Sequence, residues 1–356
     1  RAGLGRGEEN GRTNWFHFYV QDNWQVQEAL TLDVGLRYEI NQHMKDINNE
    51  LSAIDLSTPQ ARFVIASNSN GIIAPSASEL LPLIPIPYTT SADAGWSRSL
   101  MRPSYKRFAP RLGLAWRPFG NPQSVLRMGY GIFLNQWAYS IQQNLARNLP
   151  FFFLKQINTP SDAIFPAFST NNILVKNATG GISGNNLDHD FRTEYTQTWS
   201  LGLQHLLRSS TLVDLQYMGS RTVGADNSTI RNVPLPGPGP IDARRPIPAL
   251  SGFRSIRWDG WSTYHALNTR LERRFSDGLA FNLNYTFSKT MDDASAPGGT
   301  SFESNLPQNV RDLPAEKALA SFHHSHRLVG SYIYEIPMGR GLRFFAGPGI
   351  LWGSLS

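Results

Sequence analysis

Apolar and polar residues alternate with a period of two along much of the chain. Between residues 30 and 39, Leu, Leu, Val, Leu and Tyr occupy every second position, and Thr, Asp, Gly, Arg and Glu fill the positions between them. Residues 279–288 repeat the pattern, with Leu or an aromatic residue at each odd position. Side chains alternate between the two faces of a β-strand, so each segment has one apolar face and one polar face. A helix would mix the two sets, and the pattern therefore predicts strands.

Shorter stretches of the same alternation follow one another through the rest of the chain. They are residues 16–21, 111–116, 126–132, 199–204, 213–217, 267–272 and 327–336, and a weaker one begins near Leu342. This predicts about ten strands and no helix of convincing length. The expected fold class is all-β.

The predicted strands are joined by connections whose lengths alternate between short and long. The short ones are 26–29, 118–122, 207–209, 276–278 and 337–341, and the long ones are 41–106, 136–191, 221–261 and 291–323. The long segments have loop composition, and the Pro-Gly-rich residues 233–248 cannot hold a ladder. Outer-membrane barrels have short periplasmic turns and long extracellular loops. The sequence therefore predicts part of an antiparallel transmembrane β-barrel, without a second domain.

The amino-acid composition agrees with a β-barrel and argues against other classes of protein. Aromatic residues make up 12% of the chain and charged residues only 17%, whereas soluble domains carry about 25% charged residues. No apolar run reaches the roughly 18 residues of a membrane helix. The absence of Cys excludes a disulfide framework and a thiolate metal site. The net charge of +6 is scattered, so no nucleic-acid partner is expected.

The alternation assigns charged and aromatic residues to different faces of the predicted barrel. The polar face would point into the lumen, where charged residues could form ladders that contact a plug or line a passage, or simply pair across strands. These residues are Arg37, Glu39, Arg111, Arg127, Arg270, Glu272 and Arg274. Aromatic residues near strand ends are typical of an interfacial girdle, although the core of a soluble sandwich would also use them. They are Trp24, Tyr38, Trp116, Trp199 and Tyr334.

Few residues in the sequence are candidates for metal binding or catalysis. His323, His324 and His326 are the best candidates for metal ligands, but no third fixed ligand or supporting shell is visible. We therefore interpret them as histidines that are solvated or packed against aromatic residues. Two acidic pairs, Asp188 with Asp190 and Asp292 with Asp293, lack the spacing of a calcium loop. Phosphate loops, dinucleotide fingerprints and nucleophile elbows are not found. We predict no metal, no cofactor and no enzymatic activity.

Five segments in order resemble a known family. They read NWFHFYVQDNWQVQEALTLDVGLRYE at 14–39, FAPRLGLAWRPFG and VLRMGYGIFLN within 108–135, TEYTQTWSLGLQHLL and TLVDLQYMGSR within 193–221, YHALNTRLERRFSDGLAFNLNYTFSKTMDD at 264–293, and HRLVGSYIYEIPMGRG at 326–341. Together they resemble the barrel of Oar-like TonB-dependent receptors, which often carry a carboxypeptidase-regulatory-like domain at the N-terminus.

The resemblance implies an outer-membrane barrel of about 22 strands with a plug in its lumen. It further implies the outer membrane of a diderm bacterium, contact with outer-membrane lipid, an extracellular solute, and energy supplied by the TonB system through the plug and N-terminal part. We expect residues 1–356 to be a barrel segment only, with plug and N-terminal domains outside it. The family often has an Asp before its His-Arg pair, but residues 322–325 here read Phe-His-His-Ser, so no role is carried over to that position.

Two other classes of protein remain open. One is a passive porin-like channel or an adhesive surface barrel, which a plug encoded upstream would distinguish from a TonB-dependent receptor. The other is a soluble carbohydrate-active β protein such as a propeller. Propeller blades repeat about every 40–50 residues, and the hairpin spacing in this chain has no such period.

Overall fold

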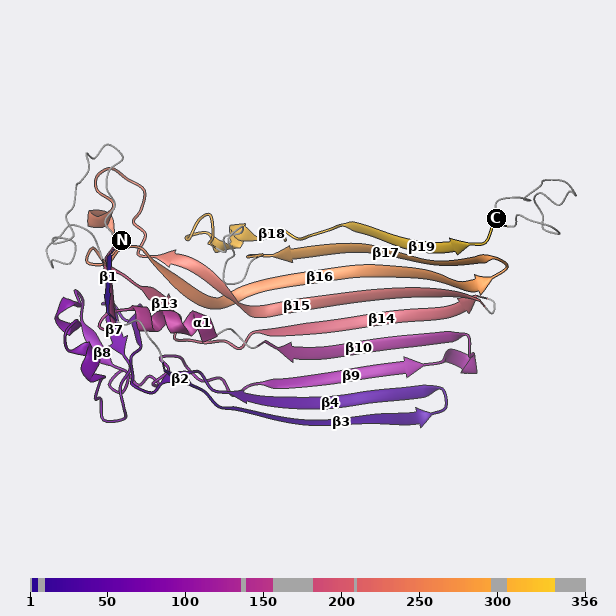
Figure 1. The fold of residues 1–356 in the computed structure, drawn as a ribbon, viewed down its shortest axis with the longest axis horizontal. Helices are drawn as coiled ribbons and strands as arrows, with labels where there is room; N and C mark the ends of the chain where they lie inside the picture. The colour runs from indigo at the N-terminus through magenta and orange to yellow at the C-terminus, as the bar shows by residue number, and fades with distance from the viewer. Residues whose placement is uncertain are drawn as a thin grey trace, which may run out of the picture.

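The dominant element of the chain is one antiparallel sheet of long strands lying side by side (Figure 1). The computed structural model describes residues 2–5, 10–135, 139–155, 182–207, 210–295 and 306–336. The long strands are β3 (Trp15–Gln27), β4 (Leu30–Asn41), β9 (Phe108–Trp116), β10 (Ser124–Leu134), β14 (Tyr195–Leu207), β15 (Thr211–Arg231), β16 (Phe253–Ser276), β17 (Leu279–Asp292) and β19 (His326–Tyr334). Each pairs with the next long strand along the chain, which confirms the predicted antiparallel arrangement.

The sheet is part of a barrel and is not closed within the described residues. Strand β3 forms one edge, and β19 lies at the other, beside β17. The strand ends that the short connections join lie at one end of the sheet, and the strand ends that the long connections join lie at the opposite end (Figure 1). The turn between β16 and β17 places Asp277 and Gly278 at φ of 52° and 74°, as the Asp-Gly turns of tight hairpins require. The predicted turn at 337–341 and the tenth strand near Leu342 fall outside the described residues.

Cross-strand register gathers the apolar side chains on one face of the sheet. Met128 pairs with Leu201, Leu201 with Tyr217, Tyr217 with Leu267, and Leu267 with Phe287. All five side chains are exposed, so they form one continuous apolar surface. A soluble protein rarely exposes such a surface, but a barrel wall facing lipid requires one.

Strands β15 and β16 are longer than their sequence pattern predicts. The segment 221–261 was expected to be a loop, but β15 continues to Arg231 and β16 begins at Phe253. Register shifts between Val223, Ala225 and Asn227 explain the error, because each bulge changes which face the following residues occupy. Alternation in the sequence is therefore lost although pairing continues.

The other three long segments also contain more structure than predicted. Two short strands precede the first long strand, β1 (Ala2–Gly5) and β2 (Gly11–Arg12). The short elements between the long strands are β5 (Lys45–Asp46), β6 (Ser52–Asp55), β7 (Arg62–Ile65), β8 (Tyr88–Thr90), β11 (Phe152–Lys155), β12 (Ile182–Ser183), β13 (Asn185–Leu187), β18 (Ala318–Leu319), the helix α1 (Tyr139–Gln142), and the 3-10 turns Pro75–Ala77, Leu81–Leu83, Pro118–Gly120, Gln143–Arg147, Asp242–Arg244 and Leu313–Glu316. Residues 43–101, 139–155, 182–191 and 232–258 pack together, and we call them the loop assembly. The expectation of loops is wrong for most of this part, but the Pro-Gly-rich residues 233–248 contain no strand, as predicted.

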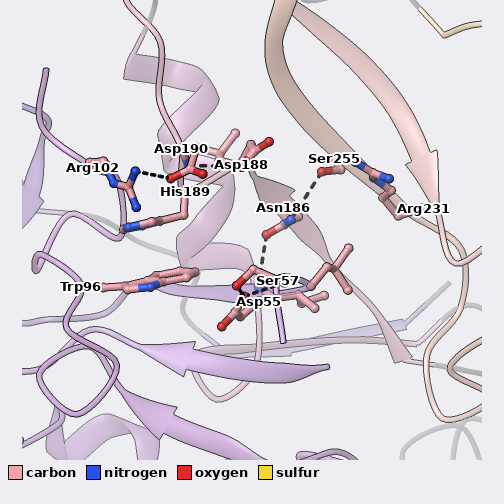
Figure 2. Close-up of a pocket in the computed structure, with 13 residues that line it drawn as sticks. Asp55, Ser57, Trp96, Arg102, Asn186, Asp188, His189, Asp190, Arg231 and Ser255 are labelled. Carbon is pink, nitrogen blue, oxygen red and sulfur yellow. Dashed lines mark hydrogen bonds and ion pairs between the residues drawn. The ribbon is translucent and has the colours of Figure 1, made fainter. Parts of the chain in front are cut away.

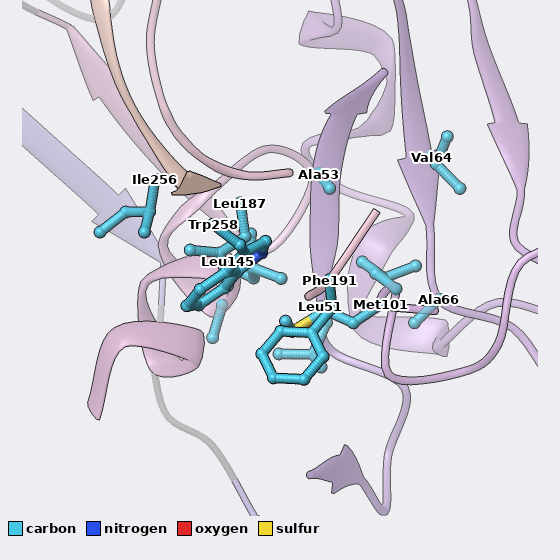
Figure 3. Packing of buried hydrophobic residues seen from close by; sticks show 12 residues of the cluster. Leu51, Ala53, Val64, Ala66, Met101, Leu145, Leu187, Phe191, Ile256 and Trp258 are labelled. Atoms are coloured by element: carbon cyan, nitrogen blue, oxygen red, sulfur yellow. The ribbon is translucent and has the colours of Figure 1, made fainter. Parts of the chain in front are cut away.

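The hydrophobic core of the chain lies in the loop assembly (Figure 3). Leu51, Met101 and Leu145 are fully buried there. Phe191 packs edge-to-face on Trp258, with ring centroids 4.9 Å apart. Burial of a large apolar side chain contributes about 1.5–3 kcal/mol, so this cluster gives the connections a fixed shape.

Buried amide side chains join segments of the loop assembly that are far apart in the sequence. Asn148 Nδ2 donates to the carbonyl oxygens of Ser52 (2.7 Å) and Asn185 (2.8 Å). Gln142 Nε2 donates to the carbonyl oxygens of Met44 (2.8 Å) and Ser99 (3.0 Å). Irregular backbone needs such partners when it is buried, and these amides supply them.

The described part of the chain has no helix with both the length and the hydrophobicity that crossing a bilayer would demand.

Candidate binding site in the loop assembly

A cavity of about 390 Å³ opens in the loop assembly, between β6, β13 and the outer ends of β15 and β16 (Figure 2). This volume is in the range of ligand sites. Its polar and aromatic lining consists of Asp55, Ser57, Trp96, Arg102, Asn186, Asp188, His189, Asp190, Arg231 and Ser255. These residues come from all of the long connections except the last, so only the folded loop assembly brings them together.

Asn186 fixes one wall of the cavity. Strand β13 pairs in parallel with β16, which sets Asn186 opposite Ser255. The Asn186 Oδ1 accepts a hydrogen bond from the backbone N–H of Ile54 (3.1 Å), and its Nδ2 donates to Ser255 Oγ (3.4 Å). One buried side chain thus ties β6 to β16 and holds Asp55 at the cavity.

A stacked aromatic pair forms a second wall. The rings of Trp96 and His189 are 3.9 Å apart at their centroids and inclined by 13°. The His189 Nδ1 lies 3.0 Å from the Leu100 carbonyl oxygen, so this nitrogen carries the proton and donates. The imidazole orientation is thereby fixed against the indole plane.

The carboxylates of the cavity differ in how they are paired. Burial of Asp55 opposes its ionisation, but hydrogen bonds from the Ser57 hydroxyl (2.6 Å) and N–H (2.9 Å) and the Arg62 guanidinium (3.0 Å) outweigh this and lower the pKa of Asp55. Asp190 pairs with Arg102 Nη1 at 3.0 Å on an exposed edge. Among the residues that the structure describes, the Asp188 carboxylate accepts one hydrogen bond, from the backbone N–H of Asp190 at 3.2 Å.

His43 supports the site from behind. Burial lowers the pKa of His43 to about 4, although its bond to the Arg102 carbonyl acts in the opposite direction. Its Nε2–H donates to that carbonyl at 3.2 Å, and its ring packs edge-to-face on Phe191 at 4.4 Å. At neutral pH the imidazole is therefore uncharged and helps to position Arg102.

The cavity offers groups of both charges beside a flat aromatic wall. Within the described residues, Arg231 has no ion pair or hydrogen bond from its guanidinium, so this cation is available to a ligand. Asp188 and the Trp96–His189 pair complete a surface suited to a polar solute with apolar ring or chain parts. In the described residues no group of three or more His, Cys, Asp or Glu side chains comes close enough to hold a metal ion.

The predicted girdle residues all lie on the apolar face of the sheet, near its two ends. Trp24, Trp116 and Tyr334 lie toward the short turns, with pairing partners Leu32, Leu126 and Leu279. Tyr38 and Trp199 lie toward the long connections. Strand β9 reaches from one level to the other in nine residues. Its eight residue steps cover roughly 26 Å, which matches the apolar band of about 25 Å in outer-membrane barrels.

The predicted lumen-facing residues share the polar face but form local pairs instead of ladders. Arg37 Nε contacts Glu39 Oε1 at 2.8 Å, and Arg270 pairs with Glu272 two residues further along the same strand. Arg111 lies over the Phe133 ring at 4.9 Å. Arg127 and Arg274 are on this face without a charged partner in the described residues. Glu39 comes closest to forming a charged ladder, because its Oε2 also lies 3.7 Å from Nη2 of the buried Arg107.

The three histidines near β19 do not converge. The Nδ1 of His326 bonds to the Tyr285 hydroxyl at 2.7 Å. His323 accepts the backbone N–H of Thr290 at 3.2 Å and contacts Ser325 Oγ at 3.0 Å. His324 is exposed. These contacts place the rings against different partners instead of around one ion.

Sequence reasoning missed the cavity itself. Asp188 and Asp190 were considered as paired acids, and both do line the cavity, but Asp190 is neutralised by Arg102. Trp96, His189 and Arg231 were not singled out. A Trp inside a long segment otherwise rich in Ser, Pro and Gly was the one available signal that this connection is packed.

An antiparallel sheet with one exposed apolar face, aromatic residues at both of its ends and long connections at one end defines an integral β-barrel protein of the outer membrane. The chain belongs to the family of the outer membrane beta barrel domain, whose model matches residues 1–355. The protein is therefore located in the outer membrane.

Solved structures with a similar arrangement are outer-membrane transporters and receptors. The outer membrane transporter YddB from Escherichia coli is 12% identical, with a TM-score of 0.44 over 80% of this chain and 25% of its own. The alcaligin receptor FauA from Bordetella pertussis is 12% identical, with a TM-score of 0.39 over 93% of this chain and 36% of its own. The chain spans about a quarter to a third of the length of these proteins. Among curated proteins, none matches the sequence.

Proposed function

We propose that this chain is the barrel portion of a TonB-dependent receptor that binds an extracellular solute in the loop assembly. The cavity at the long-connection end of the sheet carries this proposal. In an outer-membrane barrel that end faces the cell exterior, so a solute would reach the cavity before it reaches the lumen. The Oar-like resemblance of the strand segments supports the same class.

The packed core beneath the cavity favours a receptor over a passive channel. A porin needs an open passage, whereas a receptor needs a preformed site that holds its solute before transport. The buried contacts of Asn186 and His189 are those of a preformed site. We further propose that the cavity binds without catalysis, because Asp55 and Asp190 are held in ion pairs with Arg62 and Arg102.

The test uses the full-length protein in the outer membrane of a diderm host. Cells with and without a functional TonB system are given labelled oligosaccharides, peptides and ferric chelates, and accumulation is measured. We expect one class to accumulate only when TonB is functional, and Trp96→Ala to abolish that accumulation. Tyr88→Ala is the control, since Tyr88 is an exposed aromatic residue of the loop assembly outside the cavity.

TonB-independent uptake, together with steady conductance in planar bilayers, would instead identify a passive channel. Accumulation that needs TonB but is unaffected by Trp96→Ala would place the solute site elsewhere.

A further inference from the structure

The apolar face of the sheet ends in a row of aromatic and cationic residues on its long-connection side. Trp199 pairs with Gly219, Gly219 with His265, and His265 with Lys289. One row further out, Arg221 pairs with Gln197 and Thr263. Because alternate residues share a face, Arg221, His265 and Lys289 lie on the same surface as the apolar band.

The aromatic part of this boundary has a defined geometry. A Cβ on Gly219 would lie 2.5 Å from Trp199 Cε2, so the indole lies flat across that glycine. Its Nε1–H donates to the Tyr217 hydroxyl (3.4 Å), which also bonds to His265 Nδ1 at 2.9 Å. Aromatic rings with polar edges are most stable at the depth of lipid headgroups, and this cluster marks that depth.

The cations at the boundary lack acidic partners. Arg221 and Lys289 are exposed and, within the described residues, make no ion pair or side-chain hydrogen bond. Just beyond the end of β17, the Asp293 carboxylate accepts the backbone N–H of Trp261 at 2.9 Å. Lys317 adds a further charge, with its Nζ 5.6 Å above the Trp261 ring.

Several cations elsewhere on the sheet are paired with acidic side chains. At the turn end of the same face, Arg273 pairs with Asp277 at 3.2 Å. On the polar face, Arg37 and Arg270 pair with Glu39 and Glu272. The unpaired cations on the apolar face are therefore concentrated where the band meets the long connections.

We propose that Arg221, Lys289 and His265 form a binding site for the phosphorylated headgroup of an outer-leaflet lipid. Basic residues just outside an apolar span attract anionic headgroups, and arginine and lysine are the side chains that bind phosphate. The acyl chains of the same lipid would lie along Leu201, Tyr217 and Leu267. The site is independent of solute transport, since it lies on the outer wall of the barrel.

The test measures lipid retained by the purified full-length protein in detergent, using native mass spectrometry. The probe is lipid A with two phosphate groups, compared with its fully dephosphorylated form. We expect preferential retention of the phosphorylated lipid. The double substitution Arg221→Gln with Lys289→Gln should reduce it roughly fivefold for each cation removed.

The control carries the same loss of charge elsewhere. Lys106→Gln with Arg127→Gln removes one exposed Lys and one exposed Arg away from the boundary and should retain lipid within about twofold of wild type. Arg221→Lys with Lys289→Arg keeps the charge and should also retain it. Heat-modifiable gel migration reports that each variant is folded. Equal retention of both lipid forms, or an equal loss in the control, would overturn the proposal.

Discussion

Trp96 and His189 stack face to face at 3.9 Å although they come from two different long connections. His189 is held by the Leu100 carbonyl, and its own carbonyl accepts the Arg102 N–H at 2.9 Å. The pair therefore joins the connection after β4 to the one before β14. The cavity wall and the cohesion of the loop assembly depend on the same contact.

Replacing His189 tests that coupling. A stacked aromatic pair contributes about 0.5–1.5 kcal/mol beyond its buried area, so we expect His189→Ala to destabilise the loop assembly by about that amount and leave the sheet intact. Limited proteolysis of the folded protein should show faster cleavage in the connections, with unchanged heat-modifiable migration. His324→Ala is the control, because His324 is exposed outside the assembly. Equal cleavage rates in both variants would contradict a stabilising role for the stack.

The loop assembly is expected to lose stability in acid because of His43. Its folded pKa of about 4 lies below the usual value of 6.5. The unfolded chain therefore binds the proton first, and stability present above pH 6.5 is lost as the pH falls toward 4. The shift corresponds to roughly 3 kcal/mol.

Protease resistance of the connections, measured from neutral pH to about pH 4.5, should fall in wild type and stay flatter in His43→Gln. His265→Gln should keep the wild-type slope, since His265 is an exposed residue of the sheet. The two variants are compared by how steeply protease resistance changes with pH. A loss of stability in His43→Gln that is the same at every pH therefore does not affect the comparison. A slope unchanged by His43→Gln would assign the acid sensitivity to another group.

The long strands could be predicted from sequence because each of their faces meets a different environment. Residues 279–288 alternate without error since one face meets lipid and the other meets polar groups, and β17 follows that pattern. The outer part of β15 could not be predicted in this way. Beyond Val223 the bulges change which face of the sheet each following side chain occupies, and neither face meets lipid there. The period-two pattern of apolar residues therefore disappears, although the hydrogen bonds between the strands continue.

The cavity could not be predicted because its residues share no local pattern. Asp55, Trp96, His189 and Arg231 meet through contacts such as that between Asn148 and Ser52, which are 96 residues apart. Strands of two to four residues, such as β6 and β13, are too short to show a period. The charged faces of the sheet were predicted, but their pairing was not, since Arg37 and Arg270 pair within a strand instead of across strands.

Glu39 offers a test of how buried and exposed ion pairs differ on the polar face. Its carboxylate lies between Arg37 and Arg107, and the Glu39 and Arg107 side chains are only 9% and 3% exposed. Glu39→Gln removes the negative charge that lies beside the buried Arg107 guanidinium, so we expect a loss of about 3 kcal/mol. Glu272→Gln breaks a pair that is 30–43% exposed and should cost less than about 1 kcal/mol. Urea unfolding midpoints of the folded protein in detergent compare the two, and equal losses would show that Arg107 does not depend on Glu39.

Gly219 keeps the Trp199 indole flat against the outer wall. Gly219→Ala places a methyl group where the Trp199 ring lies, at 2.5 Å from Cε2, and the ring must swing away from the strand. Because the far end of a side chain can move, we expect a stability cost of only about 1 kcal/mol, together with a change in Trp199 fluorescence. To assign the fluorescence change to Trp199, Gly219→Ala is repeated in a Trp199→Phe background, where the fluorescence change should vanish. If the spectral change persists without Trp199, another of the nine Trp residues is responsible and the indole does not rest on Gly219. If it vanishes, quenching by a headgroup-depth probe should also fall in Gly219→Ala, because the displaced ring loses its bond to Tyr217 and its fixed depth at the boundary.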